Sequence, residues 1–233
     1  MSTLLWTNQK TWLAHRGSWH CFHHENTIPA FNETVKRLHD QLHGIECDLR
    51  QYLKRDPSSW VIKHDPFLQK NKRGWAQFQK STKTLLLPNF CEWILKQNKP
   101  FTINIEIKNG TSSGVAYLIN HLLGANKKNI IRYIFSTFDF HIFKQLATFN
   151  HKLRIGFLIQ GIDDLDCLYK LLPINQDVAF IGIAHEHQTK RIQKMVVDMG
   201  YTLGVYFLSL PSFYNNLSLA VINPDVSHIF TED

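Results

Sequence analysis

Three short segments in the first third of the sequence place charged or titratable side chains at the end of an apolar run or inside one. These side chains are His15 and Arg16, Glu46 and Asp48, and His64 and Asp65. Histidine exchanges protons near neutral pH, arginine binds anions, and carboxylates bind hard cations. If the fold brings these residues together, they form a reactive site for acid–base chemistry on a charged substrate.

The two carboxylates Glu46 and Asp48 lie in a segment that is typical of a strand, residues 44–49. Side chains alternate along a strand, so the two share one face and are roughly 7 Å apart. They repel each other unless a positive group lies between them, and a divalent cation such as magnesium or calcium suits oxygen ligands. A solvated strand face is the alternative interpretation, and this pair of residues alone leaves the choice open.

The segment Lys54–Ser59 has the composition of a turn. A hairpin centred on Asp56 would place position 64 opposite position 48. We therefore expect His64 to lie across from Asp48 and beside the carboxylate pair, where its pKa suits proton transfer near neutral pH.

Length and composition predict one globular α/β domain spanning residues 1–233. The chain is 44% hydrophobic and carries a net charge of +7, with a pI of about 9.2. This charge favours anionic partners, namely phosphate esters, nucleic acid or a membrane surface, without choosing among them. The four cysteines are dispersed and include no C-x-x-C pair, and no apolar run has the roughly 20 residues of a membrane span. No segment near the N-terminus is typical of a signal peptide, so we expect a soluble, cytoplasmic protein.

The segment Phe101–Lys108 has the clearest strand pattern, because apolar and polar residues alternate throughout it. In a barrel the apolar face packs on helices and the other face points into the lumen. Glu106 and Lys108 would then point inward near the carboxyl end of the strand, where barrel enzymes have their sites. The alternative is an exposed antiparallel strand, and the alternation with helical segments argues against it.

Eight strands are expected when the return arm of the hairpin is left out. They are residues 11–15, 44–49, 101–108, 130–136, 154–159, 178–183, 202–208 and 227–231. Strands that alternate with helices pair in parallel, and eight of them indicate a TIM-type (β/α)8 barrel. A doubly wound sheet is the alternative fold, and we rank it below the barrel because no glycine-rich loop follows the first strand. The last expected helix is 211–221, no final helix follows the eighth strand, and residues 2–10 or another molecule would shield that edge.

Several short motifs together resemble the glycerophosphodiester phosphodiesterase family, in order and spacing, over essentially the whole chain. They are His-Arg-Gly at 15–17, Glu-Asn-Thr at 25–27 followed by Ala-Phe, Gly-Ile-Glu-Cys-Asp at 44–48, His-Asp at 64–65, Ile-Glu-Ile-Lys at 105–108, Ser-Thr-Phe at 136–138 and Ile-Phe-Thr-Glu-Asp at 229–233. The match is strongest up to Lys108.

This resemblance implies hydrolysis of a small phosphodiester to sn-glycerol 3-phosphate and an alcohol. By the same match, the ligands of one divalent cation, magnesium or calcium, are Glu46, Asp48 and Glu106. The implied general acid and base are His15 and His64, and the implied phosphate contacts are Arg16 and Lys108. The nucleophile is water or a neighbouring hydroxyl of the substrate, and the sequence leaves this choice open.

The sequence departs from the family pattern at three places. His24 stands where the family usually has proline, and Tyr206-Phe207-Leu208-Ser209 replaces its W-T-x-N motif. The segment between His-Asp and Glu-x-Lys is short, although family members commonly carry a helical insertion there that helps to hold the glycerol end. Without this insertion the entrance to the barrel would be more open and could admit a larger substrate, so a lysophospholipid is an alternative substrate. A peripheral membrane contact would then involve Lys70, Lys72, Arg73, Trp75 and Phe78, although a solvated loop is the simpler interpretation.

Two rival functions follow from the same residues. The first is a catalytically silent barrel that binds an anion, although binding alone does not need two histidines. The second is a nucleic-acid binder, which we rank last because no stacking platform is evident. The remaining histidine groups, residues 20–24 and 185–187, are interpreted as polar loop residues. The oligomeric state is not predicted.

Overall fold

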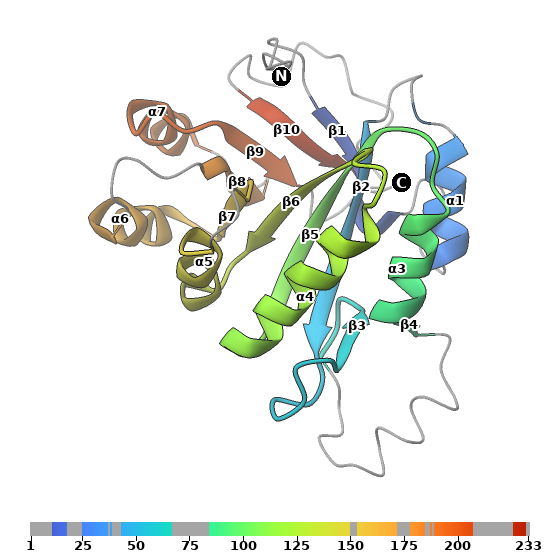
Figure 1. Ribbon diagram of the computed structural model, residues 1–233. Coiled ribbons are helices and arrows are strands. Elements are labelled where there is room, and N and C mark those ends of the chain that lie inside the picture. Colours follow the sequence, from blue (N-terminus) through green and yellow to red (C-terminus); the bar gives the residue numbers. More distant parts are fainter. Residues whose placement is uncertain are drawn as a thin grey trace.

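The computed structural model centres on a ring of parallel strands (Figure 1). It describes residues 11–17, 25–36, 38, 43–66, 84–149, 153–171, 178–184, 187, 189–206 and 226–231. The parallel strands are β1 (Thr11–Ala14), β2 (Gly44–Gln51), β5 (Phe101–Asn109), β6 (Ile131–Thr137), β7 (Ile155–Ile159), β8 (Val178–Ala184), β9 (Leu203–Tyr206) and β10 (Val226–Thr231). They pair in the order β1, β10, β9, β8, β7, β6, β5 and β2, and β1 also pairs with β2. This topology confirms the predicted TIM-type α/β fold.

The helices lie outside the strands and connect them (Figure 1). They are α1 (Ile28–Lys36), α3 (Leu87–Leu95), α4 (Ser112–Ala125), α5 (Phe140–Ala147), α6 (Ile162–Leu171) and α7 (Lys190–Asp198), with a 3-10 turn, η1 (His15–Gly17), directly after β1. Asp139 caps the N-terminus of α5, because its side chain accepts hydrogen bonds from the backbone N–H groups of His141 and Ile142. Among the described residues, none of the helices has the length and apolar character needed to span a bilayer. The assignment of all residues 1–233 to this one domain stays a prediction.

Strand β5 shows the predicted division between an apolar and a polar face. Ile103, Ile105 and Ile107 are buried in the main core together with the apolar sides of the helices. On the other face, Asn104 donates a hydrogen bond from Nδ2 to Ser136 Oγ on β6. Because β5 pairs in parallel with both β2 and β6, the alternative of an exposed antiparallel strand is excluded.

The hairpin after β2 forms, but its register differs from the prediction by one residue. Strand β3 (Trp60–Ile62) pairs antiparallel with β2, with Leu49 opposite Ile62. The backbone N–H of Lys63 donates to the carbonyl of Asp48 over 2.8 Å, so position 48 faces position 63 and not position 64. The reason is that Tyr52 N–H bonds to Ser59 O, which centres the turn between residues 55 and 56. His64 is therefore one residue beyond the position that we expected.

Three local features complete the description of the fold. Helix α1 ends at Lys36, and Leu38, two residues further on, lies in an isolated bridge. The short strand β4 (Leu85–Leu86), which pairs with β3, was not predicted. Both Cys47, which is buried, and Cys91, which is half-buried, have free thiols.

Some predictions concern residues outside the described part of the chain, and they stay predictions. These are the helix 211–221, the segment 2–10, the aromatic side chains at 206 and 207, the loop residues Lys70, Lys72, Arg73, Trp75 and Phe78, and the histidines His20, His23, His24 and His185.

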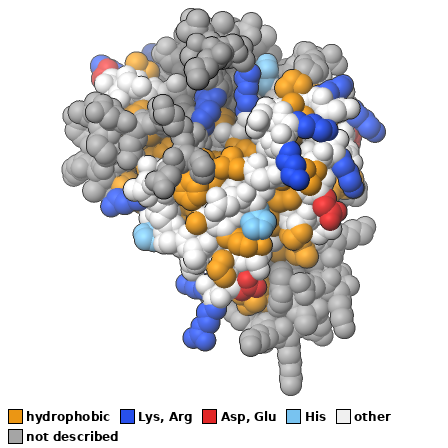
Figure 2. All heavy atoms as spheres, viewed as in Figure 1, with side chains coloured by type: hydrophobic (Ala, Val, Ile, Leu, Met, Phe, Trp, Pro, Cys, Tyr) orange, Lys and Arg blue, Asp and Glu red, His pale blue; other side chains and the backbone are white. Residues whose placement is uncertain are grey.

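On the face shown in Figure 2, basic side chains lie at several separate places.

The inward side of the strands is filled by a small apolar cluster around Phe180 of β8, with Leu13, Ile134 and Leu158. Glycines on the neighbouring strands make room for this ring. A Cβ added at Gly156 of β7 would lie 2.5 Å from Phe180 Cζ, and one added at Gly204 of β9 would lie 2.7 Å from Phe180 Cδ2. The ring therefore occupies space that any larger residue would need.

We expect Gly156→Ala to destabilise the protein by about 1–3 kcal/mol, because the buried Phe180 ring cannot move aside without repacking. Chemical denaturation measures this loss. Gly161→Ala is the matched control, since a Cβ there meets nothing within 4 Å. The double variant Gly156→Ala with Phe180→Leu should recover part of the lost stability. Equal stability of the two glycine variants would contradict the packing described for the lumen.

Candidate active site

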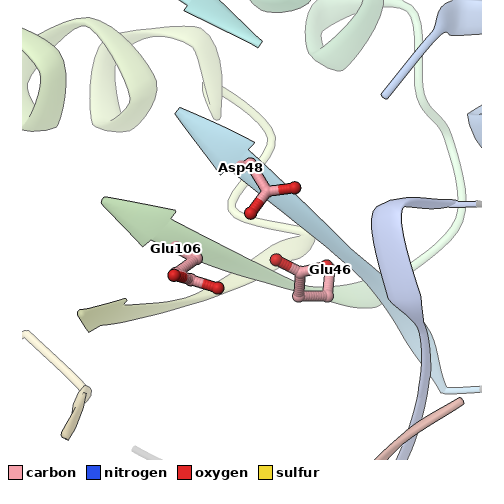
Figure 3. Close-up of side chains that lie close together, drawn as sticks. All are labelled: Glu46, Asp48 and Glu106. Carbon is pink, nitrogen blue, oxygen red and sulfur yellow. The ribbon is translucent and has the colours of Figure 1, made fainter. Parts of the chain in front are cut away.

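The residues that the sequence singled out gather at the carboxyl ends of three neighbouring strands. His15 and Arg16 lie in η1 directly after β1, Glu46 and Asp48 lie in β2, and Glu106 lies in β5 opposite Asp48. Figure 3 shows the three carboxylates, which extend from β2 and β5 and point toward one another. This is the end of the barrel where parallel-strand enzymes place their sites.

The three carboxylates form a compact, enclosed cluster. One oxygen from each of Glu46, Asp48 and Glu106 lies within 4.8 Å of the others. Their relative exposures are 2%, 0% and 6%, which excludes the solvated strand face as an interpretation. Glu46 Oε1 is buried and accepts no hydrogen bond from any described residue. Buried carboxylates need a positive partner, and three oxygen donors at this spacing fit a hard divalent cation.

Lys108 bridges two of these carboxylates. Its Nζ lies 3.1 Å from Asp48 Oδ1 and 2.6 Å from Glu106 Oε1. The same nitrogen lies 5.8 Å from the centre of the Phe138 ring, which belongs to the Ser-Thr-Phe motif. Lys108 thus lies beside the carboxylates, and two of them engage its charge before any substrate binds, while its contact with phosphate stays a prediction.

Arg16 is held in a similar way. Its backbone N–H donates to Glu46 Oε2 over 2.8 Å, and its Nη1 donates to Glu25 Oε2 over 2.8 Å. Its Nε lies 3.5 Å from Asp48 Oδ2. The backbone of Arg16 has φ 53°, a left-handed conformation that L residues seldom adopt and that strained functional positions often show. This conformation lets both the backbone and the side chain of Arg16 face the carboxylates.

Two residues of the site, Glu25 and Asn26, were not predicted to have a role there. Asn26 Nδ2 donates to Asp48 Oδ2 over 2.9 Å, and Asp48 N–H donates to Asn26 Oδ1 over 3.1 Å. Asn26 N–H also donates to the carbonyl of Arg16 over 2.8 Å. Asn26 therefore fixes Asp48, while Glu25 orients Arg16. The Glu-Asn-Thr motif was the available signal, but the sequence does not tell which side chains it contacts.

Both predicted histidines lie at the same end of the barrel. His15 Nε2 lies 3.7 Å from Glu46 Oε2. His64 Nδ1 lies 3.0 Å from Asp65 Oδ1, and the His64 carbonyl accepts a hydrogen bond of 2.6 Å from Arg50 Nε. His15 is half-buried, and His64 is more accessible, with 38% of its side chain exposed. Although His64 is not directly opposite Asp48, the two are close enough for the carboxylate to influence the pKa of His64.

The pKa values of the three carboxyl groups shift in different directions, because burial, mutual repulsion and nearby cations act on them unequally. Burial, with Asp48 nearby, raises the pKa of Glu46 to about 8, and burial also raises the pKa of Glu106. Burial acts in the same direction on Asp48, but Lys108, His15 and Asn26 outweigh it and hold its pKa below the usual value. Burial lowers the pKa of His64, which favours the neutral imidazole near pH 7. Because the pKa of Glu46 lies above 7, the carboxylate cluster holds a proton at neutral pH, and a bound cation would displace that proton.

We expect the affinity for magnesium or calcium to rise with pH by up to about tenfold per pH unit below pH 8, because Glu46 must lose its proton when the cation binds. Isothermal titration calorimetry at pH 6.5 and 8.5, in buffers of different ionisation enthalpy, measures the proton release. Glu46→Gln should flatten the pH dependence while it weakens binding. Binding in wild type that releases no proton at pH 6.5 would contradict the raised pKa of Glu46.

No protein-family model and no curated protein matches the chain by sequence. Several solved structures match it by fold. One, assigned as a glycerophosphodiester phosphodiesterase from Galdieria sulphuraria, has a TM-score of 0.69 at 16% identity and covers 95% of this chain and 93% of its own. A phosphodiesterase from Oleispira antarctica, in complex with the product sn-glycerol-3-phosphate, has a TM-score of 0.64 at 16% identity over 95% of this chain and 92% of that chain.

A glycerophosphodiester phosphodiesterase from Parabacteroides distasonis ATCC 8503 has a TM-score of 0.66 at 15% identity, and it covers 96% of this chain and 92% of its own. Sequence identity this low speaks for the fold alone. The resemblance that the motifs indicated thus extends to three dimensions, and this chain shares, over nearly its whole length, the fold of the glycerophosphodiester phosphodiesterases.

Proposed function

We propose that this protein is a metal-dependent phosphodiesterase that hydrolyses glycerophosphodiesters to sn-glycerol 3-phosphate and an alcohol. The single observation that carries the proposal is the buried cluster of Glu46, Asp48 and Glu106 beside two histidines. An anion-binding barrel without catalysis would not need three buried carboxylates, which repel an anionic ligand. Glu46, Asp48 and Glu106 would hold the cation, which when bound draws charge off the phosphoryl oxygens.

The chain's own residues supply the proton transfers. His64, whose lowered pKa keeps it neutral near pH 7, removes the proton from the attacking hydroxyl, whether that belongs to water or to the substrate. His15 then protonates the leaving oxygen of the alcohol. Glu46 lies 3.7 Å from His15 Nε2, where its carboxylate orients the imidazole. In this assignment, the two histidines act on opposite oxygens of one phosphodiester.

Cationic side chains support the phosphate. Arg16 and Lys108 border the carboxylates and balance the negative charge that develops on the phosphoryl oxygens. Their ion pairs with Glu25, Asp48 and Glu106 fix their positions in advance, so little reorganisation is needed during the reaction. The choice between magnesium and calcium, the cytoplasmic location and the oligomeric state stay predictions or open questions.

Product analysis tests the proposed substrate class. The protein is incubated with glycerophosphocholine and, separately, with lysophosphatidylcholine, and released sn-glycerol 3-phosphate, choline and lysophosphatidic acid are measured. The proposal expects release of sn-glycerol 3-phosphate and choline from glycerophosphocholine. Turnover of the lysolipid alone would instead assign a lysophospholipase D-like activity. A folded protein that cleaves neither would favour the anion-binding barrel.

A further inference from the structure

Arg50 is a third cationic side chain at the site, and neither the motifs nor the resemblance gave it a role. It follows Asp48 by two positions in β2, so strand alternation places it on the same inward face as Glu46 and Asp48. It is half-buried, unlike the fully buried strand residues before it. Arg50 therefore lies beyond Asp48 toward the carboxyl end of β2, close enough for Asp48 and Glu106 to influence its pKa.

The donors of Arg50 are not committed to carboxylates, in contrast to those of the other two cations. Arg16 and Lys108 each form ion pairs with two acidic side chains. The bond that Arg50 makes to a described residue comes from its Nε, which donates to the carbonyl of His64 over 2.6 Å. No described residue forms a hydrogen bond or ion pair with its two terminal amino groups. Within the described part of the chain, those amino groups are therefore charged donors of the site that are not paired with a carboxylate.

The position of Arg50 is nonetheless fixed by its surroundings. Its backbone pairs with Val61 of β3 on one side and with Asn109 of β5 on the other. The next residue, Gln51, exchanges two hydrogen bonds with the Asn109 side chain, Gln51 N–H to Oδ1 over 3.0 Å and Nδ2 to Gln51 O over 3.2 Å. These contacts fix the backbone of Arg50, and the Nε bond to the carbonyl of His64 restrains its guanidinium, so less conformational entropy is lost when the guanidinium binds an oxyanion.

The electrostatic environment also suits an anion beside Arg50. Burial opposes its charge, while the carboxylates of Asp48, Glu106 and Asp65 support it. Once a divalent cation neutralises the cluster, this support weakens, and a negatively charged ligand becomes the natural partner of the guanidinium. The carbonyl bond to His64 links the same side chain to the proposed general base.

We propose that Arg50 is a further substrate-binding residue, which uses its terminal amino groups to bind the phosphate of the phosphodiester while its Nε keeps the His64 segment in place. This proposal rests on the proposed function. Under this proposal the cationic side chains have two different roles. Arg16 and Lys108 are held by carboxylates, whereas the terminal amino groups of Arg50 bind the ligand.

The test compares Arg50→Gln, Arg50→Lys and the exposed hairpin control Arg55→Gln. Glutamine places an N–H donor at the same distance from the backbone as arginine Nε, so it can keep the bond to His64 while it removes the charge. Lysine keeps the charge. The measurements are KM and kcat for glycerophosphocholine and, without turnover, the Kd of sn-glycerol 3-phosphate, each with the melting temperature as a check of folding.

We expect Arg50→Gln to raise both KM and Kd by about 10–100-fold, the range for a lost charge-assisted hydrogen bond. Arg50→Lys should recover part of this loss, and Arg55→Gln should change neither constant by more than about twofold. An Arg50→Gln variant with lower kcat but unchanged KM and Kd would overturn the proposal and leave Arg50 only a support for His64. Wild-type protein that binds sn-glycerol 3-phosphate, with the affinity lost in Arg50→Gln, but cleaves no glycerophosphocholine would contradict the proposed function alone. Wild type that neither binds sn-glycerol 3-phosphate nor cleaves glycerophosphocholine would overturn both.

Discussion

Asp48→Asn should lower kcat for glycerophosphocholine by about two to three orders of magnitude, the range for loss of a central electrostatic group. Asp48 is fully buried and is contacted by Lys108, Asn26 and Arg16. An asparagine of nearly the same shape would remove its charge while it largely keeps its volume. The cation site would then lose one of three anionic oxygens, and Lys108 would retain only Glu106 as a partner.

Two measurements separate loss of the site from loss of the fold. Equilibrium dialysis with magnesium or calcium should show weaker binding to the variant, and circular dichroism should show its folded content. Because removing one member of a buried ion pair costs about 3–5 kcal/mol, the variant is compared with wild type well below the melting temperature of both. Asp198→Asn is the matched control, since Asp198 is an exposed carboxylate whose ion pair is with exposed Lys194 on the same helix. Unchanged kcat and metal affinity in a folded Asp48→Asn variant would show that the cluster is not the catalytic centre.

His64→Ala should lower kcat by about 10²–10⁴-fold with a smaller change in KM, because a general base acts on the transition state more than on the bound substrate. The pKa of His64 lies below its usual value, mainly through burial. The neutral form of His64, which is the active base, therefore becomes the dominant form below pH 7. With magnesium or calcium kept saturating at every pH, so that the proton on Glu46 does not limit the rate, kcat should rise with pH in the acidic range and be level around pH 7. In the variant, this acidic limb of the pH–rate profile should disappear.

The matched control for this prediction is His121→Ala. His121 lies on helix α4, where it stacks on Tyr117 and bonds to its carbonyl, away from the carboxylates. Steady-state kinetics from pH 5 to 9 would give both profiles. A His64→Ala variant that keeps the acidic limb and most of its kcat would assign the general base to another residue.

The fold was predictable because the signal for it is local. Alternation in Phe101–Lys108 predicted the strand, its buried apolar face and the inward position of Glu106, and the structure shows all three. The repeated change from strand to helix predicted parallel pairing. The error in the hairpin came from its turn, because composition indicates where a chain reverses but not whether the reversal is centred on Asp56 or half a residue before it.

The site was predictable as a set of residues but not as a set of contacts. Motif spacing brought together the carboxylates, the histidines, Arg16 and Lys108. The partners of these groups depend on distances between segments far apart in the sequence, such as Asn26 with Asp48. For the same reason, the sequence alone did not reveal that Arg16 and Lys108 are already paired or that Arg50 faces the site. The packing of Phe180 against Gly156 and Gly204 likewise requires the register of three strands.

The measurement that tests the central claim most directly is phosphorus NMR of glycerophosphocholine incubated with the protein after complete chelation and again after magnesium or calcium is restored. We predict no change in the phosphodiester signal without a cation. With the cation restored, the signal of sn-glycerol 3-phosphate should appear with wild type and remain near background with Asp48→Asn. Equal cleavage in the chelated and restored samples, or in wild type and Asp48→Asn, would contradict a metal-dependent phosphodiesterase built on Glu46, Asp48 and Glu106.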